Sequence, residues 1–159
     1  MQKSFTKDQA IQKLKHYCSY QERCHNEVKQ KLWELRVPRQ DHDDIISKLI
    51  EEDYLNEERF AKLFVGGRFR VKGWGKNKIL YALKEKQISQ YNIREAMKEV
   101  DEDEYRSAVL KFAEKKYSEL KGEQYLVRTK KTMDYLQQKG FEPEIASQAI
   151  NEIKKKDVN

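Results

Sequence analysis

Positively charged side chains gather around one tryptophan in the middle of the sequence. From Gly66 to Lys86 the chain carries seven cations and a single acid, Glu85. Lysine and arginine bind phosphates or carboxylates through charge, while an indole either packs in a core or stacks on a nucleic acid base. We prefer packing for this tryptophan. The pattern predicts a basic binding edge whose candidate residues are Arg68, Arg70, Lys72, Trp74, Lys76 and Lys78.

Acidic residues are segregated on either side of this edge. The segment EEDYLNEE, residues 51–58, holds five acids and no base, and EVDEDE, residues 99–104, also holds five acids. A run of like charge is usually a solvated helix face. Here, however, the cations lie on both sides of a glycine-marked turn, which favours an edge that meets phosphates or an acidic partner. The acidic runs suit the first turns of helices better than a magnesium site.

Other chemistry finds little support in the sequence. Cys18 and Cys24 lie near His16 and His25, but their spacing is not C-x-x-C, so buried or idle thiols are preferred over zinc ligands. The segment GWGKNK lacks the spacing of a phosphate-binding loop, and neither a nucleophile elbow nor an HExxH motif occurs. We therefore expect no catalytic residue, no metal, no cofactor and no enzymatic activity.

The composition indicates a helical protein. The 159 residues include 38% charged and 38% hydrophobic residues, with only 6 Gly and 2 Pro, and the abundant Glu, Lys, Leu and Gln favour helix. A net charge of +6 is compatible with nucleic acid, an anionic surface or an acidic protein. The sequence has neither a membrane-length apolar run nor a signal-peptide core at its start, so we expect a cytoplasmic protein.

Apolar residues recur at helical spacing throughout, and several helix starts can be read directly. Thr6 with Gln9 and Ser19 with Glu22 form capping boxes, Asn56 and Ser89 are suited to cap the helices that follow them, and Pro143 lies near a helix start. The box at Ser19 predicts a helix that begins there and stops before Pro38.

The helical pattern repeats about every fifty residues. Shifts of 51 and then 53 residues superpose three buried-looking triplets, namely Val28, Leu32 and Val37, then Ile79, Leu83 and Ile88, then Thr132, Leu136 and Phe141. Such a period predicts tandem helical units that lean on one another. The expected fold is all-α: an extra N-terminal helix, residues 1–18, and three three-helix repeats, residues 19–72, 73–121 and 122–159.

Residues 63–71 admit two interpretations. Gly66-Gly67 between apolar runs is a hairpin signal. The repeat instead aligns Phe64–Phe69 with Phe112–Tyr117, FAEKKY, which has high helix propensity. We favour helix, weakened by the two glycines at about 1 kcal/mol each.

The segment EEDYLNEERFAKLFVGGRFRVKGWGKNKILYALKEKQIS resembles the central signature of the RecX family, bacterial modulators of the RecA recombinase. The matching residues include an acidic lead, the Phe60-Ala61 pair, the basic run and the Gly-Trp-Gly joint. TMDYLQQKGFEPEIASQAI resembles the family's C-terminal unit. Two departures stand out: Gly66-Gly67 where a continuous helix is expected, and Arg36 and Gln87 at helix ends where the third copy has Gly140. The residues that the resemblance marks as structural are Tyr54, Leu55, Asn56, Phe60, Gly73 and Gly75.

The resemblance implies that the three-helix units form an elongated, curved array. It also implies a non-enzymatic regulator that binds RecA, as a filament on single-stranded DNA, and inhibits it more often than it stimulates it. We expect the chain to be a monomer. Its basic edge would meet the filament, with direct DNA contact as a further possibility. Two alternatives stay open: a direct nucleic-acid-binding protein of helix-turn-helix type, and a helical adaptor that needs no basic edge. Steep salt dependence of binding to free duplex would identify the first of these.

Overall fold

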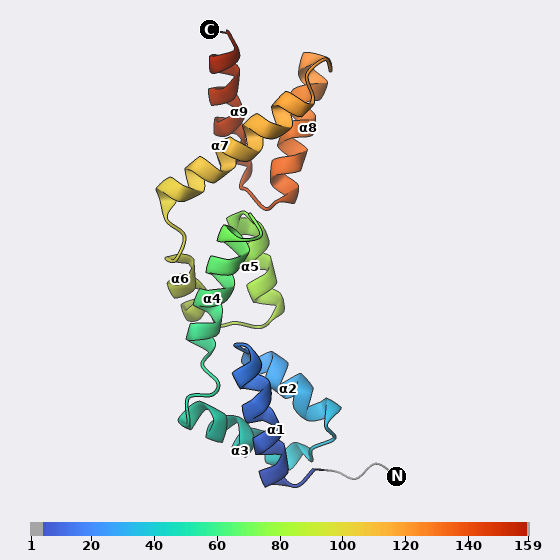
Figure 1. Ribbon diagram of the computed structural model, residues 1–159, viewed down its shortest axis with the longest axis vertical. Helices are drawn as coiled ribbons and strands as arrows, with labels where there is room; N and C mark the ends of the chain where they lie inside the picture. Colours follow the sequence, from blue (N-terminus) through green and yellow to red (C-terminus); the bar gives the residue numbers. More distant parts are fainter. Residues whose placement is uncertain (1–4, 159) are drawn as a thin grey trace. The chain divides into compact units, whose positions relative to one another are not determined.

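The computed structural model describes residues 5–158, with side chains as far as Lys156, and these residues form nine α-helices and no strand (Figure 1). The all-α prediction is confirmed. Within this described part, no helix is long and apolar enough to cross a membrane. The helices are α1 Lys7–Tyr20, α2 His25–Glu34, α3 Arg39–Glu51, α4 Glu57–Arg70, α5 Lys76–Glu85, α6 Gln90–Met97, α7 Glu102–Glu119, α8 Tyr125–Gln138 and α9 Pro143–Val158.

The chain divides into two compact units, and α4 and α5 each contribute residues to both. The first unit contains the described residues up to Leu63 together with Leu83–Ala96. In it, α1, α2 and α3 contact one another in pairs. Their core holds the apolar faces that the sequence pattern indicated, namely Ala10, Leu14, Cys18, Val28, Leu32, Val37, Ile45, Ile46, Leu49 and Leu55.

The second unit contains Phe64–Ala82 and the described residues from Met97 onward. In it, α7, α8 and α9 contact one another in pairs. A chain of aromatic rings joins the end of α4 to this group: Phe69 lies 5.7 Å from Tyr105, Tyr105 lies 5.3 Å from Phe141, and Phe141 lies 6.0 Å from Phe112, centroid to centroid. Aromatic pairs at these separations add to the burial energy.

Gly66 and Gly67 lie inside a continuous helix. α4 runs unbroken from Glu57 to Arg70, so the hairpin interpretation is wrong. Tertiary burial compensates for the weak propensity, because Val65 is fully buried and Phe64 and Phe69 are nearly so.

The fifty-residue repeat appears in the backbone as three matching helix ends. Arg36, Gln87 and Gly140 all adopt positive φ, at 57°, 60° and 103°. In each case the residue that follows donates its N–H to a carbonyl five residues earlier, which is the Schellman closure. The three bonds are Val37 to Leu32 at 3.0 Å, Ile88 to Leu83 at 3.1 Å and Phe141 to Leu136 at 3.0 Å. Two of these helix ends therefore take the glycine conformation without glycine.

Most predicted helix starts are confirmed, and one is wrong. The Thr6–Gln9 capping box is present, Asn56 and Ser89 accept hydrogen bonds from N–H groups three residues later, and Pro143 is the first residue of α9. Ser19, in contrast, lies inside α1, which continues to Tyr20. The next helix begins at His25, where Glu27 accepts the N–H of Cys24 at 3.1 Å. The helix predicted to begin at Ser19 is thus displaced, because Cys18 extends the buried stripe of α1.

Candidate functional site: the basic joint

The connection from α4 to α5, Gly73-Trp74-Gly75, lies within the second unit. Gly73 has φ 70°, and a Cβ there would lie 2.7 Å from the Phe112 ring. Gly75 packs backbone to backbone against the end of α8: its N–H donates to the Lys139 carbonyl at 2.7 Å, and an added Cβ would overlap Gly140 and Phe141. Glycine is required at both positions, for its conformation at the first and for close approach at the second.

This geometry presents Trp74 beside two cations. The indole is half-buried and lies edge-on to Phe64, with ring centroids 6.5 Å apart. The Arg68 guanidinium lies 5.3 Å from the Trp74 centroid, and the Lys78 ammonium lies 4.6 Å from it. Both distances are within the range of cation–π attraction. Trp74 therefore packs in part, as preferred above, and also anchors two charges from different helices.

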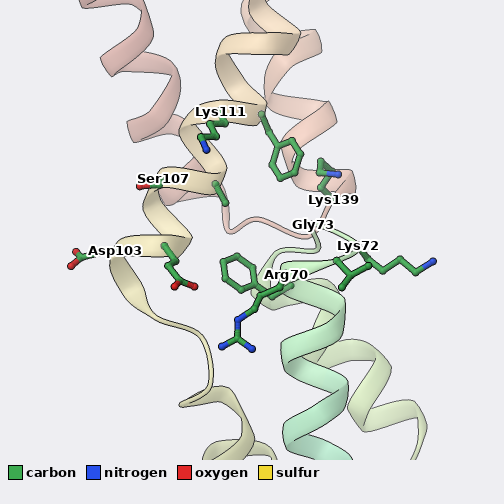
Figure 2. A pocket seen from close by; sticks show the side chains of 12 residues that line it. Arg70, Lys72, Gly73, Asp103, Ser107, Lys111 and Lys139 are labelled. Atoms are coloured by element: carbon green, nitrogen blue, oxygen red, sulfur yellow. The ribbon is translucent and has the colours of Figure 1, made fainter. Parts of the chain in front are cut away.

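Arg70 and Lys72 line a groove of about 660 Å³ between the end of α4 and the first half of α7 (Figure 2). Its floor is apolar and includes Phe69, Ala108 and Phe112. Figure 2 shows Asp103 and Ser107 on α7 with their side chains directed away from the end of α4, and the Lys72 side chain extends away on the opposite side. The Arg70 guanidinium donates to the Glu99 carbonyl at 3.1 Å, and no ion pair of Lys72 occurs among the described residues.

Lys76 does not join the other cations as a free charge. Its ammonium lies 2.5 Å from Glu102 and 4.7 Å from the centroid of the Tyr105 ring. Its N–H donates to the Tyr105 hydroxyl at 2.9 Å, and that hydroxyl donates to Glu142. Burial, followed by the hydrogen bond to Glu142, raises the pKa of Tyr105. The structure thus places Lys76 in an internal network that fixes the start of α5.

The structure adds Lys139, which sequence reasoning missed. Its ammonium lies 4.1 Å from the Phe112 centroid and 5.7 Å from the Tyr135 centroid. Burial, and then the nearby charge of Lys78, lower the pKa of Lys139. Its one sequence signal is its place beside Gly140 at the third repeated helix end, and that signal does not reveal contact with a segment more than sixty residues earlier.

The signature residues before the joint lie in the first unit. Leu55 is buried in the core, Asn56 accepts the Arg59 N–H at 2.9 Å at the start of α4, and Phe60 is buried. Lys15 lies over the Tyr54 ring at 5.3 Å. These contacts are those of residues that hold a helix connection in place.

Cys18 and Cys24 are buried free thiols, and burial raises the pKa of each to about 11. A thiol with a raised pKa is a poorer metal ligand at neutral pH because thiolate is the ligating form. Within the described residues, no group of three or more His, Cys, Asp or Glu side chains is arranged to hold a metal ion.

Comparisons with known proteins agree with the repeat geometry. Residues 56–97 match the family model described as RecX, second three-helix domain, and residues 102–150 match the third three-helix domain. These ranges correspond to α4–α6 and α7–α9.

Individual relatives carry the same name. The chain is 27% identical over 138 residues to the regulatory protein RecX of Oceanobacillus iheyensis, covering 87% of this chain and 51% of that protein. It is 35% identical over 111 residues to that of Clostridium tetani, covering 69% of this chain and 50% of that protein. The chain spans about half the length of the curated relatives it matches.

Solved structures extend the likeness to the fold. The crystal structure of RecX from Lactobacillus salivarius superposes with a TM-score of 0.85 at 25% identity, covering 93% of this chain and 96% of that one. A second RecX crystal structure gives a TM-score of 0.83 at 22% identity, covering 92% and 71%. Two models of one family match more than half of the sequence, and the helices follow the same course, so the chain belongs to the RecX family.

Proposed function

We propose that this chain is a cytoplasmic, non-enzymatic regulator of the RecA recombinase. It is a monomer that binds RecA assembled as a filament on single-stranded DNA, and it inhibits RecA. The observation that carries the proposal is the basic joint of a RecX chain. There, Arg68 and Lys78 are held beside Trp74, and Lys72 projects with no acid bound to it among the described residues.

The joint is suited to a rigid, charged docking edge. Its backbone is fixed by the two glycines and by the hydrogen bonds of Gly75 and Asn77 to the end of α8. Cations held in place before binding lose less side-chain entropy when they meet phosphates or carboxylates. Lys76 is excluded from this edge because Glu102 already neutralises it.

The test compares two triple variants of equal charge. Arg68→Ala, Arg70→Ala and Lys72→Ala together, the joint triple, remove three cations at and just after the end of α4 and leave Lys78 in place. Lys29→Ala, Lys115→Ala and Lys121→Ala together remove three exposed lysines for which the described residues provide no ion pair. Binding to RecA assembled on single-stranded DNA is measured by pull-down, and RecA ATPase by inhibition titration. We expect the joint triple to lose both activities, with a melting temperature close to the parent's, while the control retains them. Equal activity of the two triples would exclude the joint from the interaction.

The same protein samples distinguish the proposed regulator from a protein that binds duplex DNA directly. Such a protein binds free duplex with a steep salt slope and without RecA. We expect the parent chain to prefer the RecA filament over a free duplex of equal length at physiological salt. Tighter binding to the free duplex would replace the regulator with a nucleic-acid-binding protein.

A further inference from the structure

A second cationic surface lies in the first unit, far along the sequence from the joint. It is a groove of about 310 Å³ between the last turns of α1 and the outer face of α2. We call it the α1–α2 groove, and its lining residues are Lys13, His16, Tyr17, Tyr20, Arg23, Lys31 and Leu35. Three of these are permanent cations, one is a histidine and none is a carboxylate. A groove lined by one sign of charge attracts the opposite sign.

Arg23, one of the residues that line this groove, is held by two contacts with Tyr17. Its guanidinium lies over the Tyr17 ring, with Cζ 3.6 Å from the centroid. Its Nε donates to the Tyr17 carbonyl at 3.1 Å. The contacts recorded for Arg23 use the guanidinium face and Nε, so its terminal nitrogens remain available to a phosphate oxygen, which arginine binds in a two-pronged manner.

Tyr20 supplies an uncommitted aromatic ring. The side chain is 79% exposed, and among the described residues no hydrogen bond or ring contact engages it. Tyr17, one turn earlier on α1, is by contrast already covered by Arg23 and by Lys31, whose ammonium lies 5.3 Å from its centroid. An exposed ring beside positioned cations is the arrangement that stacks bases of a single strand while charges follow its backbone.

The second unit contains a similar arginine–tyrosine pair, which shows the structural role of this contact. Arg128 lies 3.5 Å from the Tyr117 centroid, and its Nε donates to the Tyr117 carbonyl at 2.7 Å. Stacking of this kind therefore ties a helix end to the following segment in both units. In this second unit, Glu123 lies 2.9 Å from Lys131, which follows Arg128 by three residues. At the α1–α2 groove, the exposed Glu34 carboxylate lies 3.7 Å from the Lys31 ammonium. An exposed pair at this distance is weak, so Glu34 competes weakly with a phosphate for Lys31.

We propose that the α1–α2 groove binds single-stranded nucleic acid, with Lys13, Arg23 and Lys31 on consecutive phosphates and Tyr20 stacked on a base. The exposed ring favours a nucleic acid over an acidic protein segment, because every base offers a flat face to Tyr20 whereas a carboxylate needs only the cations. The contacts involve no base edge, so binding is independent of sequence.

The test uses the full chain without RecA. A negative result therefore leaves the proposed function unaffected, and a positive result does not depend on the proposed function. Binding of a fluorescein-labelled oligothymidylate is followed by anisotropy between 50 and 200 mM salt. Tyr20→Ala is compared with Tyr91→Ala, which removes a 60% exposed tyrosine of the same unit. Lys13→Ala with Lys31→Ala is compared with Lys29→Ala with Lys115→Ala, which removes equal charge elsewhere.

We expect Tyr20→Ala to weaken binding by roughly tenfold at every salt concentration, since stacking contributes about 1–3 kcal/mol for each base. The Lys13 and Lys31 pair should lower the slope of log K against log salt by about 1.4, at about 0.7 for each phosphate contact. The proposal would be overturned if Tyr20→Ala and Tyr91→Ala had the same affinity for the oligothymidylate. It would also be overturned if the Lys13 and Lys31 double variant kept the salt slope of the parent. A glutamate-rich peptide that requires Lys13 and Lys31, while the oligonucleotide does not, would likewise overturn it.

Discussion

Gly75 and Gly67 differ in what surrounds their α-carbons. A Cβ on Gly75 would overlap the backbone of Gly140 and Phe141, which cannot move without disturbing the end of α8, whereas a Cβ on Gly67 meets nothing within 4 Å. Gly67 also lies inside α4, where alanine is favoured by about 1 kcal/mol. We predict that Gly75→Ala lowers the free energy of unfolding by about 2 kcal/mol or more, and that Gly67→Ala raises it by about 0.5 to 1 kcal/mol.

Urea denaturation followed by circular dichroism at 222 nm measures both variants. Opposite signs are the informative result, because both changes add the same methyl group within one short segment. A neutral Gly75→Ala would mean that the joint does not make the close backbone contact described above.

Tyr105 joins three parts of the second unit through one hydroxyl. It accepts the N–H of Lys76 and donates to Glu142, while its ring is almost wholly buried. Tyr105→Phe keeps the ring and leaves both partners unsatisfied, so we expect a loss of about 1–3 kcal/mol in the free energy of unfolding. Tyr117→Phe is the matched control, because Tyr117 is also buried on α7 but makes its recorded hydrogen bond through the backbone carbonyl. A similar loss of unfolding free energy in the two variants would contradict a specific stabilising role of the Tyr105 hydroxyl.

The two buried thiols make a pH-dependent contribution to the stability of the first unit. Burial raises the pKa of Cys18 and Cys24 from 9.0 to about 11. A raised folded pKa means that stability is complete below pH 9 and is lost as the pH rises towards 11, because the unfolded chain releases these protons first. At 1.36 kcal/mol for each pKa unit, we predict that the two thiols together cost about 2–3 kcal/mol between pH 8 and pH 10.

Denaturation at both pH values, in the presence of reductant, tests this dependence. The Cys18→Ala, Cys24→Ala double variant should show a much smaller change over the same range, whatever its absolute stability. An equal change in the parent and the double variant would assign the dependence to other groups.

At the scale of helices, the sequence predicted most elements because each was marked locally. Thr6, Asn56 and Ser89 cap where their side chains allow it, and Pro143 starts a helix where its missing N–H costs nothing. Ser19 misled because its capping pattern competed with burial of Cys18 in the core of the first unit. Here the tertiary burial of Cys18 outweighed the local capping pattern of Ser19.

The candidate site was only partly predictable for the same reason. Trp74 and the cations around it were visible as a run in the sequence, but the neutralisation of Lys76 by Glu102 depends on how α5 lies against α7. The contact of Gly75 with Gly140 joins segments that share no sequence pattern. The period of about fifty residues, likewise, does not by itself state which helix opens a unit.

The repeated helix ends provide a prediction at this scale. Arg36 and Gln87 hold φ near 60°, a conformation that costs a residue with a side chain about 1–2 kcal/mol and glycine nothing in sterics. Glycine pays about 0.5–1 kcal/mol in chain entropy. We therefore expect Arg36→Gly to stabilise the protein by about 0.5–1 kcal/mol, in urea denaturation. The control, Lys29→Gly inside α2, should destabilise it by about 1 kcal/mol. Destabilisation by both would show that the Arg36 side chain contributes more than its strained backbone costs.

For the molecule as a whole, net charge and local charge should affect different rates. In the proposed complex, the net charge of +6 would act at long range and steer the chain towards the anionic filament, whereas the joint cations would act only after contact. Removing three cations anywhere lowers the net charge equally. We therefore predict that the joint triple and the Lys29, Lys115 and Lys121 triple slow association with the RecA filament to a similar extent, and that this effect shrinks as salt rises and the screening length falls below about 10 Å.

Dissociation should then separate the two triples. Contacts made in the bound complex govern how long it lasts, so the joint triple should dissociate roughly tenfold faster or more, and the control triple at the parent rate. A biosensor carrying RecA assembled on single-stranded DNA measures both rates at 50 and 200 mM salt. If the joint triple alters association alone and leaves dissociation unchanged, its cations act only through the net charge of the molecule, and the filament must be held by another surface.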